Sequence, residues 1–597
     1  MSIFERIKSF RDVMIKENID YYVIPSEDAH QGEYVPSYYK GRAFMSGFTG
    51  SAGTLLIGRS IAILWTDGRY FIQAENQLKG TKIELYKMRI EGYSTLSEWI
   101  EKNIGDKEVL AFDGNVIAIK TYKKMQEYAS KNNFEIKIDK DLLTDSWSDR
   151  PELPKDKAFI HDVKYCGKSV NQKIKDVLAI MISEDGDSYI VSSLDDVAWL
   201  FNIRGNDVEN NPFVLAHGVV TRGSTTLYID LNKVDETFIR SLASEGVSVK
   251  DYYDINSELK LLEGNILVDE RRVSAFLYEK LSKSANVIHK LEIVASLKAI
   301  KNNIEIENLE RCQIRDGVAM LRFTKWLKGN IGKIEISEIS ASDKLEEFRA
   351  MGDLYKGISF DTIAGHKEHG AMMHYFATKE SEYILEEKGF LLVDSGGQYL
   401  DGTTDITRTF ILGKLTDEEK KDFTLVLKGH LALMNAKFLK GSTGSHLDIL
   451  ARQPLWSNGI DYKCGTGHGV GFFLSVHEGP QGINRVSTLP LELGMILTNE
   501  PGIYKEGKHG IRTENTMIVE PYMISEEFGE FYKFRTISYC PIDLDGVDLS
   551  IMNSEEREHL NDYHKLVKEK LEVYIKNEVV DDKDELLEFL AYATKLV

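Results

Sequence analysis

The pattern of apolar and polar positions changes period along the first third of the chain. Residues 1–20 carry apolar side chains at Ile3, Ile7 and Phe10 with charges between them, which is the spacing of a helix with one buried face. Short apolar runs bounded by polar, proline or glycine residues follow at 21–25, 54–57 and 61–65. Helices that alternate with short strands predict an α/β layered domain over residues 1–155.

The same alternation returns after a short linker. Residues 148–154 contain two prolines and mixed charges, which prevent regular structure. Helical spacing over 171–182 and a strand-like run at 189–191 then predict a second α/β domain, residues 156–300. Its similar layout is consistent with an old duplication of the first domain.

The remaining chain reads as α+β. A helix with one buried face is expected from residue 301 to about 326. A second helix is expected from Thr416, with Glu419 completing a capping box, through Phe438. Strand runs lie between and after these helices, so we expect a domain of helices packed on a curved antiparallel sheet over residues 301–540.

The last part of the chain, residues 541–597, is strongly charged and helical. Helices are expected at 554–568 and 581–595. We interpret this helical extension as a cap on the preceding domain or as a contact between subunits.

Charge and cysteine content limit the possible binding partners and the cellular compartment of the protein. A formal net charge of −20 opposes binding to nucleic acid and to anionic membranes. The four cysteines are far apart and form no CxxC pair, which favours a reducing compartment. The start of the chain lacks the apolar core of a signal peptide, and no run of about 18 apolar residues occurs. We therefore expect a cytoplasmic protein without nucleic-acid or membrane partners.

The stretch 389–410 carries the first candidate chemistry. An apolar run ends at Asp394, a glycine-rich turn follows, and a second β-rich run begins near Asp405, which together predict a hairpin with carboxylates at strand ends. Taken alone, an aspartate before Ser-Gly-Gly is common turn chemistry. The downstream sequence decides between these interpretations.

Three more polar residues occupy similar positions. His468 lies in a glycine-dense loop, Glu500 ends a strand that Pro501 terminates, and Glu514 lies in the β-run 510–519. Each has a plain alternative: a loop histidine, a turn residue, and half of a surface pair with Arg512. The order Asp, Asp, His, Glu, Glu, with spacings of 11, 63, 32 and 14 residues, makes a chance combination improbable.

Four carboxylates and one imidazole are a suitable ligand set for two divalent metal ions. Two ions balance four carboxylates that could not all stay ionised together in a partly buried pocket. Bridging carboxylates can hold such ions about 3.5–4 Å apart and leave positions for water, whose pKa falls towards neutral pH. Oxygen-rich ligands favour Mn²⁺ or Co²⁺ over a thiolate-type zinc site. The reaction class predicted is metal-assisted hydrolysis.

The chain resembles the pita-bread metallopeptidases, and among them the three-domain, cytosolic Xaa-Pro aminopeptidases (aminopeptidase P). Besides the five candidate ligands, the resemblance rests on segments 46–53 and 65–70 of the first domain and 196–205 of the second. It implies two creatinase-like N-terminal α/β domains, a pita-bread catalytic domain and a C-terminal helical extension.

The resemblance also implies roles for single residues. Asp405 and Glu514 would bridge two metal ions, most simply Mn²⁺, with Co²⁺ or Zn²⁺ as alternatives. Asp394 would complete one coordination shell and His468 with Glu500 the other, and Glu500 would also act as general base for a bridging hydroxide. His374 and His477 would position the substrate and stabilise the oxyanion. Arg512 would orient the metal ligands.

One position departs from the family pattern. Relatives have histidine where this chain has Cys464, within the run Cys464–His468. A thiol there could slow the reaction, alter binding of the first substrate residue, or expose the site to oxidation.

The function implied is removal of the N-terminal residue from peptides with proline in second position, by a homodimer. A prolidase acting on Xaa-Pro dipeptides is the nearer alternative, although the second α/β domain and the C-terminal extension favour the aminopeptidase. A non-catalytic peptide-binding protein of the same fold is the more distant one, and the presence of all five ligand types opposes it.

Overall fold

The computed structural model describes residues 1–290, 293–577 and 582–597. The chain divides into two compact units, one formed by residues 1–161 and 168–297, the other by 162–167 and 298–597. Within the described ranges, no helix combines the length and apolar character needed to span a membrane. The four-part division at residues 155, 300 and 540 stays a prediction.

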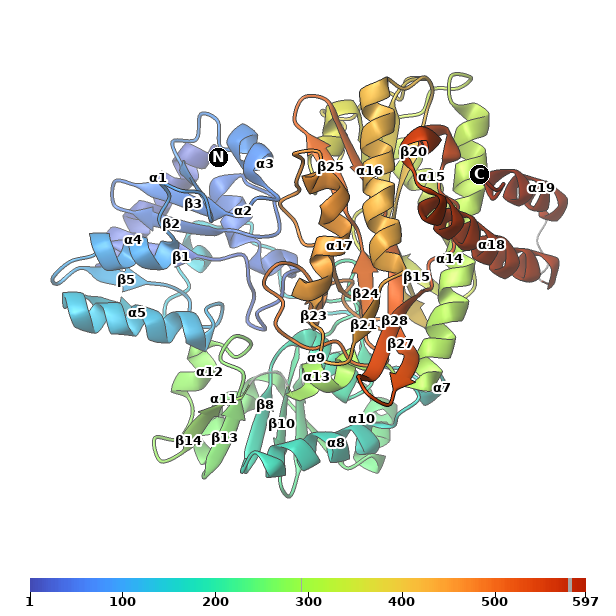
Figure 1. Cartoon of the computed structure of the whole chain (residues 1–597). Helices are drawn as coiled ribbons and strands as arrows, with labels where there is room; N and C mark the ends of the chain where they lie inside the picture. The colour runs from blue at the N-terminus through green and yellow to red at the C-terminus, as the bar shows by residue number, and fades with distance from the viewer. Residues whose placement is uncertain (291–292, 578–581) are drawn as a thin grey trace. The chain divides into compact units, whose positions relative to one another are not determined.

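The first domain is a six-stranded sheet between two helical layers (Figure 1). Alternating strand residues face opposite sides, because successive side chains of a strand point to opposite faces. Tyr22 and Leu55 pack with helix α1 (Ile3–Lys16), whereas Val23 and Leu56 pack with α4 (Leu96–Asn103) and α5 (Ile119–Asn132). The sheet order is β4-β3-β2-β1-β5-β6, with bounds β1 Tyr21–Ile24, β2 Thr54–Gly58, β3 Ala62–Thr66, β4 Glu84–Lys87, β5 Val109–Ala111 and β6 Glu135–Lys137.

The second domain repeats this topology strand for strand. Its order is β12-β11-β10-β8-β13-β14, and the sequence of parallel and antiparallel pairings equals that of the first sheet. The bounds are β8 Ser188–Val191, β10 Ala216–Thr221, β11 Thr225–Ile229, β12 Val247–Lys250, β13 Asn265–Val268 and β14 Asn286–His289, with helices α8 Val170–Ser183, α9 Leu194–Leu200 and α10 Glu236–Ser244. The similar layout expected from the sequence is therefore present, with mixed sheets in both domains.

The second unit packs long helices on an antiparallel sheet, as expected. The sheet has the order β21-β28-β27-β24-β22-β23, with bounds β21 Lys437–Leu439, β22 Gly467–Gly469, β23 Glu478–Ile483, β24 Ile496–Asn499, β27 Asn515–Ser525 and β28 Gly529–Thr536. The helices are α14 Asn303–Asn330, α15 Glu338–Ala350, α16 Asp417–Met434 and α17 Gly444–Trp456.

Smaller sheets of the second unit carry the predicted hairpin. Strand β17 (Phe390–Ser395) pairs antiparallel with β20 (Ile406–Ile411) and with β16 (Ile363–His366). The hairpin's turn contributes to a separate sheet, β15-β18-β19, with bounds Tyr355–Ile358, Gly397–Tyr399 and Gly402–Thr403, and a further pair is β25 (Gly502–Lys505) with β26 (His509–Arg512).

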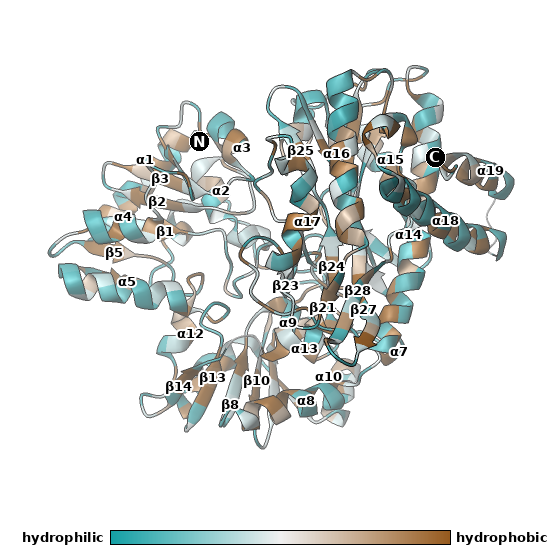
Figure 2. Ribbon diagram, in the orientation of Figure 1, coloured by the Kyte–Doolittle hydropathy of each residue, from teal (hydrophilic) through white to brown (hydrophobic). Residues whose placement is uncertain are grey.

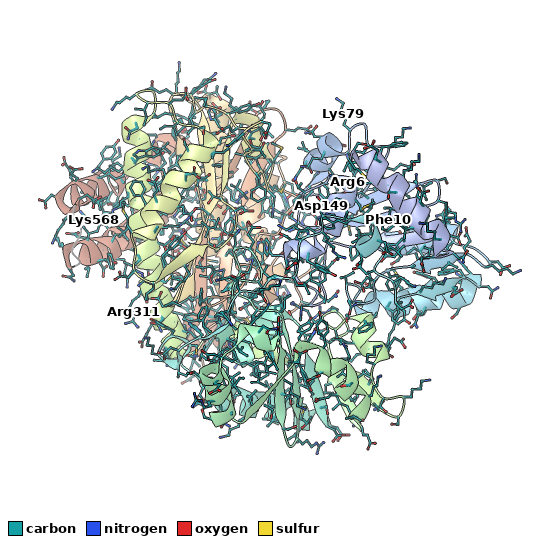
Figure 3. The ribbon with its side chains drawn as sticks, turned by 180° about the vertical axis from the view of Figure 1, so that it is seen from behind. Arg6, Phe10, Lys79, Asp149, Arg311 and Lys568 are labelled. Atoms are coloured by element: carbon teal, nitrogen blue, oxygen red, sulfur yellow. The ribbon has the colours of Figure 1, made fainter. Side chains whose placement is uncertain are left out.

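The C-terminal extension shares the core of the large sheet. Helix α18 (Ser554–Asn577) buries Leu560 and Val567 in one apolar cluster with Met517 of β27, and helix α19 (Lys583–Ala593) adds Leu586. Figure 2 shows apolar residues along the strands and polar residues on the outer helix faces. Figure 3 shows Lys79 and Lys568 extending from the surface, where both are exposed.

Three sequence-based expectations need correction or restriction. The helix from Thr416 ends at Met434, and Phe438 lies in β21, where it pairs with Tyr532 and is buried. The β-run 510–519 is broken after Arg512 and resumes at Asn515, so that Glu514 lies between two strands. Asp581, the expected start of the last helix, lies outside the described residues, and α19 begins at Lys583.

Candidate metal centre

Neighbouring strand ends bring two glutamates to one edge of the large sheet. Antiparallel pairing places Asn499, the end of β24, opposite Asn515, the start of β27. Glu500 follows the first strand and Glu514 precedes the second, so both carboxylates lie at the same edge. His468 belongs to β22, the next strand on the other side of β24, and its amide donates to Thr498 Oγ1 at 3.1 Å.

The hairpin meets the large sheet at this edge. The Glu514 amide donates to the Thr407 carbonyl at 3.1 Å, and Thr516 Oγ1 donates to the Asp405 carbonyl at 3.2 Å. Asp405 immediately precedes β20, and Asp394 lies on β17 opposite Thr407. Two sheets thus supply carboxylates to one place.

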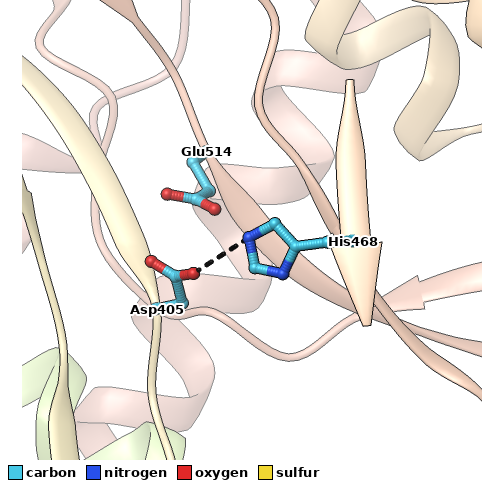
Figure 4. Close-up of side chains that lie close together, drawn as sticks. All are labelled: Asp405, His468 and Glu514. Carbon is cyan, nitrogen blue, oxygen red and sulfur yellow. Dashed lines mark ion pairs between the residues drawn. The ribbon is translucent and has the colours of Figure 1, made fainter. Parts of the chain in front are cut away.

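The side chains converge closely. Asp405, His468 and Glu514 each offer one ligand atom, and these three atoms lie within 4.8 Å of one another (Figure 4). His468 Nε2 is 3.4 Å from Asp405 Oδ2 and 3.4 Å from Glu500 Oε1. This is the spacing of groups that can share cations.

The protonation of His468 suits a ligand. Its Nδ1 lies 2.8 Å from the Gly469 carbonyl, which can only accept a hydrogen bond, so Nδ1 carries the proton. In the neutral ring, Nε2 then keeps its lone pair and faces the carboxylates. Such a carbonyl partner is typical of metal-binding histidines.

Arg512 holds Asp394. Its guanidinium lies 2.5 Å from Asp394 Oδ2 and also donates to Thr407 Oγ1 at 3.1 Å and to Tyr504 Oη at 2.8 Å. The other oxygen, Asp394 Oδ1, is buried and has no hydrogen-bond partner among the residues that the structure describes. A buried carboxylate oxygen without a donor is costly, and a cation would satisfy it.

Glu514 is fixed from two directions. Thr407 Oγ1 donates to Glu514 Oε2 at 2.8 Å. Arg408, which is buried, donates to the Glu514 carbonyl at 2.6 Å, to the Thr407 carbonyl at 2.9 Å and to Tyr563 Oη of α18 at 2.7 Å.

The carboxylates of the site repel one another, so that nearby positive charge would stabilise their ionised forms. Burial, followed by the nearby Glu514 and other carboxylates, raises the pKa of Asp405 well above its usual range. Burial and the neighbouring carboxylates likewise raise the pKa of Glu514, and burial above all raises the pKa of Glu500 to about 7. Four clustered carboxylates, one imidazole and an orphaned carboxylate oxygen therefore fit two divalent cations.

The two other predicted histidines flank this cluster differently. The His477 ring lies edge-on to that of His468, with centroids 4.4 Å apart. His374 is half-buried and follows the short helix η5 (Lys367–Ala371). Their roles, like those of the five ligands and Arg512, stay predictions.

Cys464 is half-buried beside the centre. It packs against the main apolar cluster of the unit, and its carbonyl accepts a hydrogen bond from Arg452 at 2.9 Å. Burial, and then the charge of Glu500, raises the pKa of the thiol to about 12. The thiol is therefore neutral at neutral pH, which makes it a poor nucleophile and lowers its sensitivity to oxidation.

Several supporting residues were not identified from the sequence. Thr407 and Thr498 lie two residues from Asp405 and Glu500, a spacing that places side chains on one face of a strand and could have indicated them. Tyr504 and Arg408 have no comparable local signal.

Comparison with known proteins covers nearly the whole chain. Models of the creatinase/prolidase N-terminal domain match residues 6–137 and 149–305, that of metallopeptidase family M24 matches 307–521, and that of the C-terminal region of peptidase M24 matches 530–597. A protein of Tuber melanosporum described as "Probable Xaa-Pro aminopeptidase P" is 39% identical over 97% of each chain. One of Laccaria bicolor with the same description is 39% identical over 94% of this chain and 89% of the relative.

Solved structures agree with this relationship. The X-prolyl aminopeptidase of Caenorhabditis elegans, described as a cytosolic enzyme with a di-nuclear active site, matches with a TM-score of 0.94 and 31% identity over 100% of both chains. An Xaa-Pro dipeptidase of Bacillus anthracis, at 22% identity and a TM-score of 0.50, covers 63% of this chain and 99% of its own and shares the fold alone. This chain belongs to metallopeptidase family M24, within its Xaa-Pro aminopeptidase P group.

Proposed function

We propose that this protein is a metal-dependent aminopeptidase that removes the N-terminal residue from peptides whose second residue is proline. The observation that carries the proposal is the convergence of Asp405, His468 and Glu514 within 4.8 Å at the meeting of two sheets. Support for the substrate class comes from end-to-end similarity to proteins described as Xaa-Pro aminopeptidases.

Two divalent ions are proposed as the cofactor, with Mn²⁺ favoured because carboxylate oxygens dominate the ligand set. When bound, such ions lower the pKa of a water molecule enough to make it a nucleophile near neutral pH. Asp405 and Glu514 are proposed to be shared between the ions, Asp394 to serve one of them, and His468 with Glu500 the other. The di-nuclear site described for the nematode enzyme supports this stoichiometry.

The chain's own groups can move the proton and hold the substrate. Glu500 is proposed to accept a proton from the attacking water and to pass it to the departing amine, since its carboxylate lies 3.4 Å from His468 Nε2, within the candidate site. His477, edge-on to His468, and His374 are proposed to donate hydrogen bonds to the oxygen of the reacting carbonyl. Arg512 orients Asp394 and, through Thr407, Glu514.

A cytoplasmic homodimer is proposed as the working form. The description of the nematode enzyme as cytosolic supports the location. Sedimentation analysis of the purified protein measures the oligomeric state directly.

The decisive experiment compares two substrates with reconstituted metal. The protein is stripped with a chelator, then supplied with Mn²⁺, Co²⁺ or Zn²⁺ separately, and assayed with an Xaa-Pro-Xaa tripeptide and an Xaa-Pro dipeptide. We expect metal-dependent cleavage of the tripeptide after its first residue. Cleavage of the dipeptide alone would identify a prolidase, and metal binding without cleavage of either would favour the non-catalytic alternative.

A further inference from the structure

A buried carboxylate outside the candidate metal centre accepts hydrogen bonds from four groups. Glu338, the first residue of α15, is 0% exposed. Four groups donate to its two oxygens. They are the backbone amides of His366 (2.7 Å) and Tyr383 (2.9 Å), the His369 ring at Nδ1 (3.0 Å) and the Tyr375 hydroxyl (2.9 Å).

All four donors come from one segment, residues 366–383, and this segment contains His374. Within it, the His369 ring is stacked between the rings of Tyr375 and Tyr383, at centroid distances of 4.2 Å and 3.8 Å. The backbone of α15 also binds this segment, because the Glu338 amide donates a hydrogen bond to the Tyr383 carbonyl at 3.1 Å. The two sides of the segment, before and after His374, are thus fastened to one side chain.

A carboxylate in this position strongly resists the loss of a donor. Hydrogen bonds to an ionised group are stronger than neutral ones, and a buried charge left short of donors keeps its full desolvation penalty. These bonds therefore hold His366, His369, Tyr375 and Tyr383 together at the start of α15.

The same segment touches the strands that support the metal centre. Strand β16 runs into the segment at His366 and pairs Ile363 with Asp394. On another side, η5 lies backbone to backbone on β26, since a Cβ atom added to Gly510 would lie 1.6 Å from the Gly370 carbonyl oxygen. Strand β26 ends in Arg512.

We infer that Glu338 is a positioning residue for the peptidase reaction: it fixes segment 366–383 so that His374 keeps one place relative to Asp394 and Arg512. The inference rests on the proposed function of His374. A purely structural role predicts a different result, namely a loss of stability that lowers activity whether or not His374 is present.

The test uses Glu338→Gln and the milder Tyr375→Phe, which removes one hydroxyl donor and keeps the ring stack. The glutamine amide cannot accept at both positions, so at least one buried donor is left unpaired. We expect kcat with the tripeptide to fall about 10–100-fold for Glu338→Gln, the size expected for a misplacement of about 1 Å. KM is expected to change less than about threefold, because the metal ligands and the rest of the site are kept.

Asp316→Asn is the matched control. Asp316 is also a buried carboxylate that binds α15, but its donors are Arg349 (2.7 Å) and Tyr399 (2.9 Å), outside segment 366–383. It is expected to lower the melting temperature with kcat within about threefold of the parent. An equal fall in kcat for Asp316→Asn and Glu338→Gln at equal destabilisation would overturn the inference.

A double-mutant comparison isolates the path through His374. In a His374→Ala background, Glu338→Gln is expected to cause less than about a twofold further loss of kcat, because the group that it positions is already absent. The same 10–100-fold loss in both backgrounds would refute a role exerted through His374.

A measurement without catalysis separates this inference from the proposed function. Hydrogen exchange of the full chain is expected to speed up at least tenfold in residues 366–375 and at Tyr383 in Glu338→Gln, with bound metal unchanged. If the parent protein cleaves no Xaa-Pro peptide, the proposed function fails while this exchange result still stands. Unchanged hydrogen exchange in residues 366–383 would show that Glu338 does not hold this segment in place.

Discussion

Arg512 donates a hydrogen bond of 2.5 Å to one oxygen of Asp394, and the other oxygen of that carboxylate has no partner within residues 1–290, 293–577 and 582–597. One oxygen of Asp394 is thus held by a cationic side chain, and the negative charge of Asp394 contributes to the raised pKa values of Asp405 and Glu514. Burial alone would lower the pKa of Arg512, but Tyr504, Asp394 and Glu500 raise it well above the usual range. Arg512 therefore stays charged near neutral pH.

Replacing Arg512 with lysine tests this arrangement. Lysine keeps the positive charge but cannot reach Asp394, Thr407 and Tyr504 together. We expect metal affinity to fall about 10–100-fold, as for other residues that orient metal ligands. A competitive titration with a chelator measures the affinity. Arg485→Lys, at an exposed pair with Asp461, is the control and should leave it unchanged.

Asp405→Asn and Glu514→Gln test the proposed sharing of ligands. Each substitution removes one negative charge and one ligand oxygen from the point of convergence. We expect metal content to drop from two ions to one or none, and kcat to fall by at least about 10³-fold. Metal analysis of the purified variants and a tripeptide assay give both numbers. Full activity in either variant would refute the bridging assignment.

The metal-free protein should lose stability as the pH rises. The pKa of Glu500 is about 7 when folded, against 4.5 for an ordinary glutamate, so the folded state binds the extra proton in that window. Its contribution to stability is present below pH 4.5 and disappears as the pH rises through 7. Asp405 and Glu514 act in the same direction.

Melting temperatures of chelator-treated protein from pH 5 to pH 8 measure this effect. We expect a falling melting temperature in the metal-free protein and a smaller fall after addition of Mn²⁺, which balances the carboxylates. Asp405→Asn should flatten the metal-free profile. Identical profiles with and without metal would show that the carboxylates do not bind it.

Cys464→His tests the expectation that Cys464 departs from the family pattern. The thiol is neutral and half-buried, so its replacement removes no charge from the site. We expect kcat to stay the same or to rise by up to about tenfold, because an added imidazole can donate a hydrogen bond to substrate. Steady-state kinetics beside Cys464→Ser separate the gain of imidazole from the loss of sulfur. A large loss of kcat in both variants would give the thiol a role of its own.

Gly510→Ala tests the close approach of η5 to β26. The added methyl group would meet the backbone of Gly370, which cannot move without the segment that carries His374. We expect a destabilisation of about 1–3 kcal/mol together with a fall in kcat. Gly329→Ala is the control, because its Cβ meets nothing within 4 Å in helix α14. That change should stabilise the protein by about 0.5–1 kcal/mol.

Three of the candidate ligands could be proposed from the sequence because each carries a local mark. Asp394 ends an apolar run before glycines, His468 lies among glycines, and Pro501 follows Glu500. The strands so indicated are present, and the family predicted from these motifs is confirmed by the comparisons. Local sequence therefore predicted the strands beside the candidate ligands, except at Glu514, where the expected β-run is broken.

What the sequence could not show depends on distant partners. Glu338 reads as an ordinary residue at a helix start, and its donors lie 28 to 45 residues further on. Phe438 continues the helical spacing of α16, yet the chain leaves the helix after Met434 and pairs Phe438 with Tyr532 of β28. At Phe438, tertiary pairing overrode local periodicity.

Arg408 connects helix α18 of the C-terminal extension to the candidate metal centre by hydrogen bonds. Its guanidinium donates both to the Glu514 carbonyl and to Tyr563 Oη, and Tyr563 Oη in turn donates to the carbonyl of Cys540 at 2.8 Å. A premature stop codon shortly before Ser554 would leave a buried arginine short of an acceptor beside Glu514, a proposed metal ligand. Such a shortened gene product would be impaired in metal binding as well as in stability, although all the proposed ligands would still be encoded.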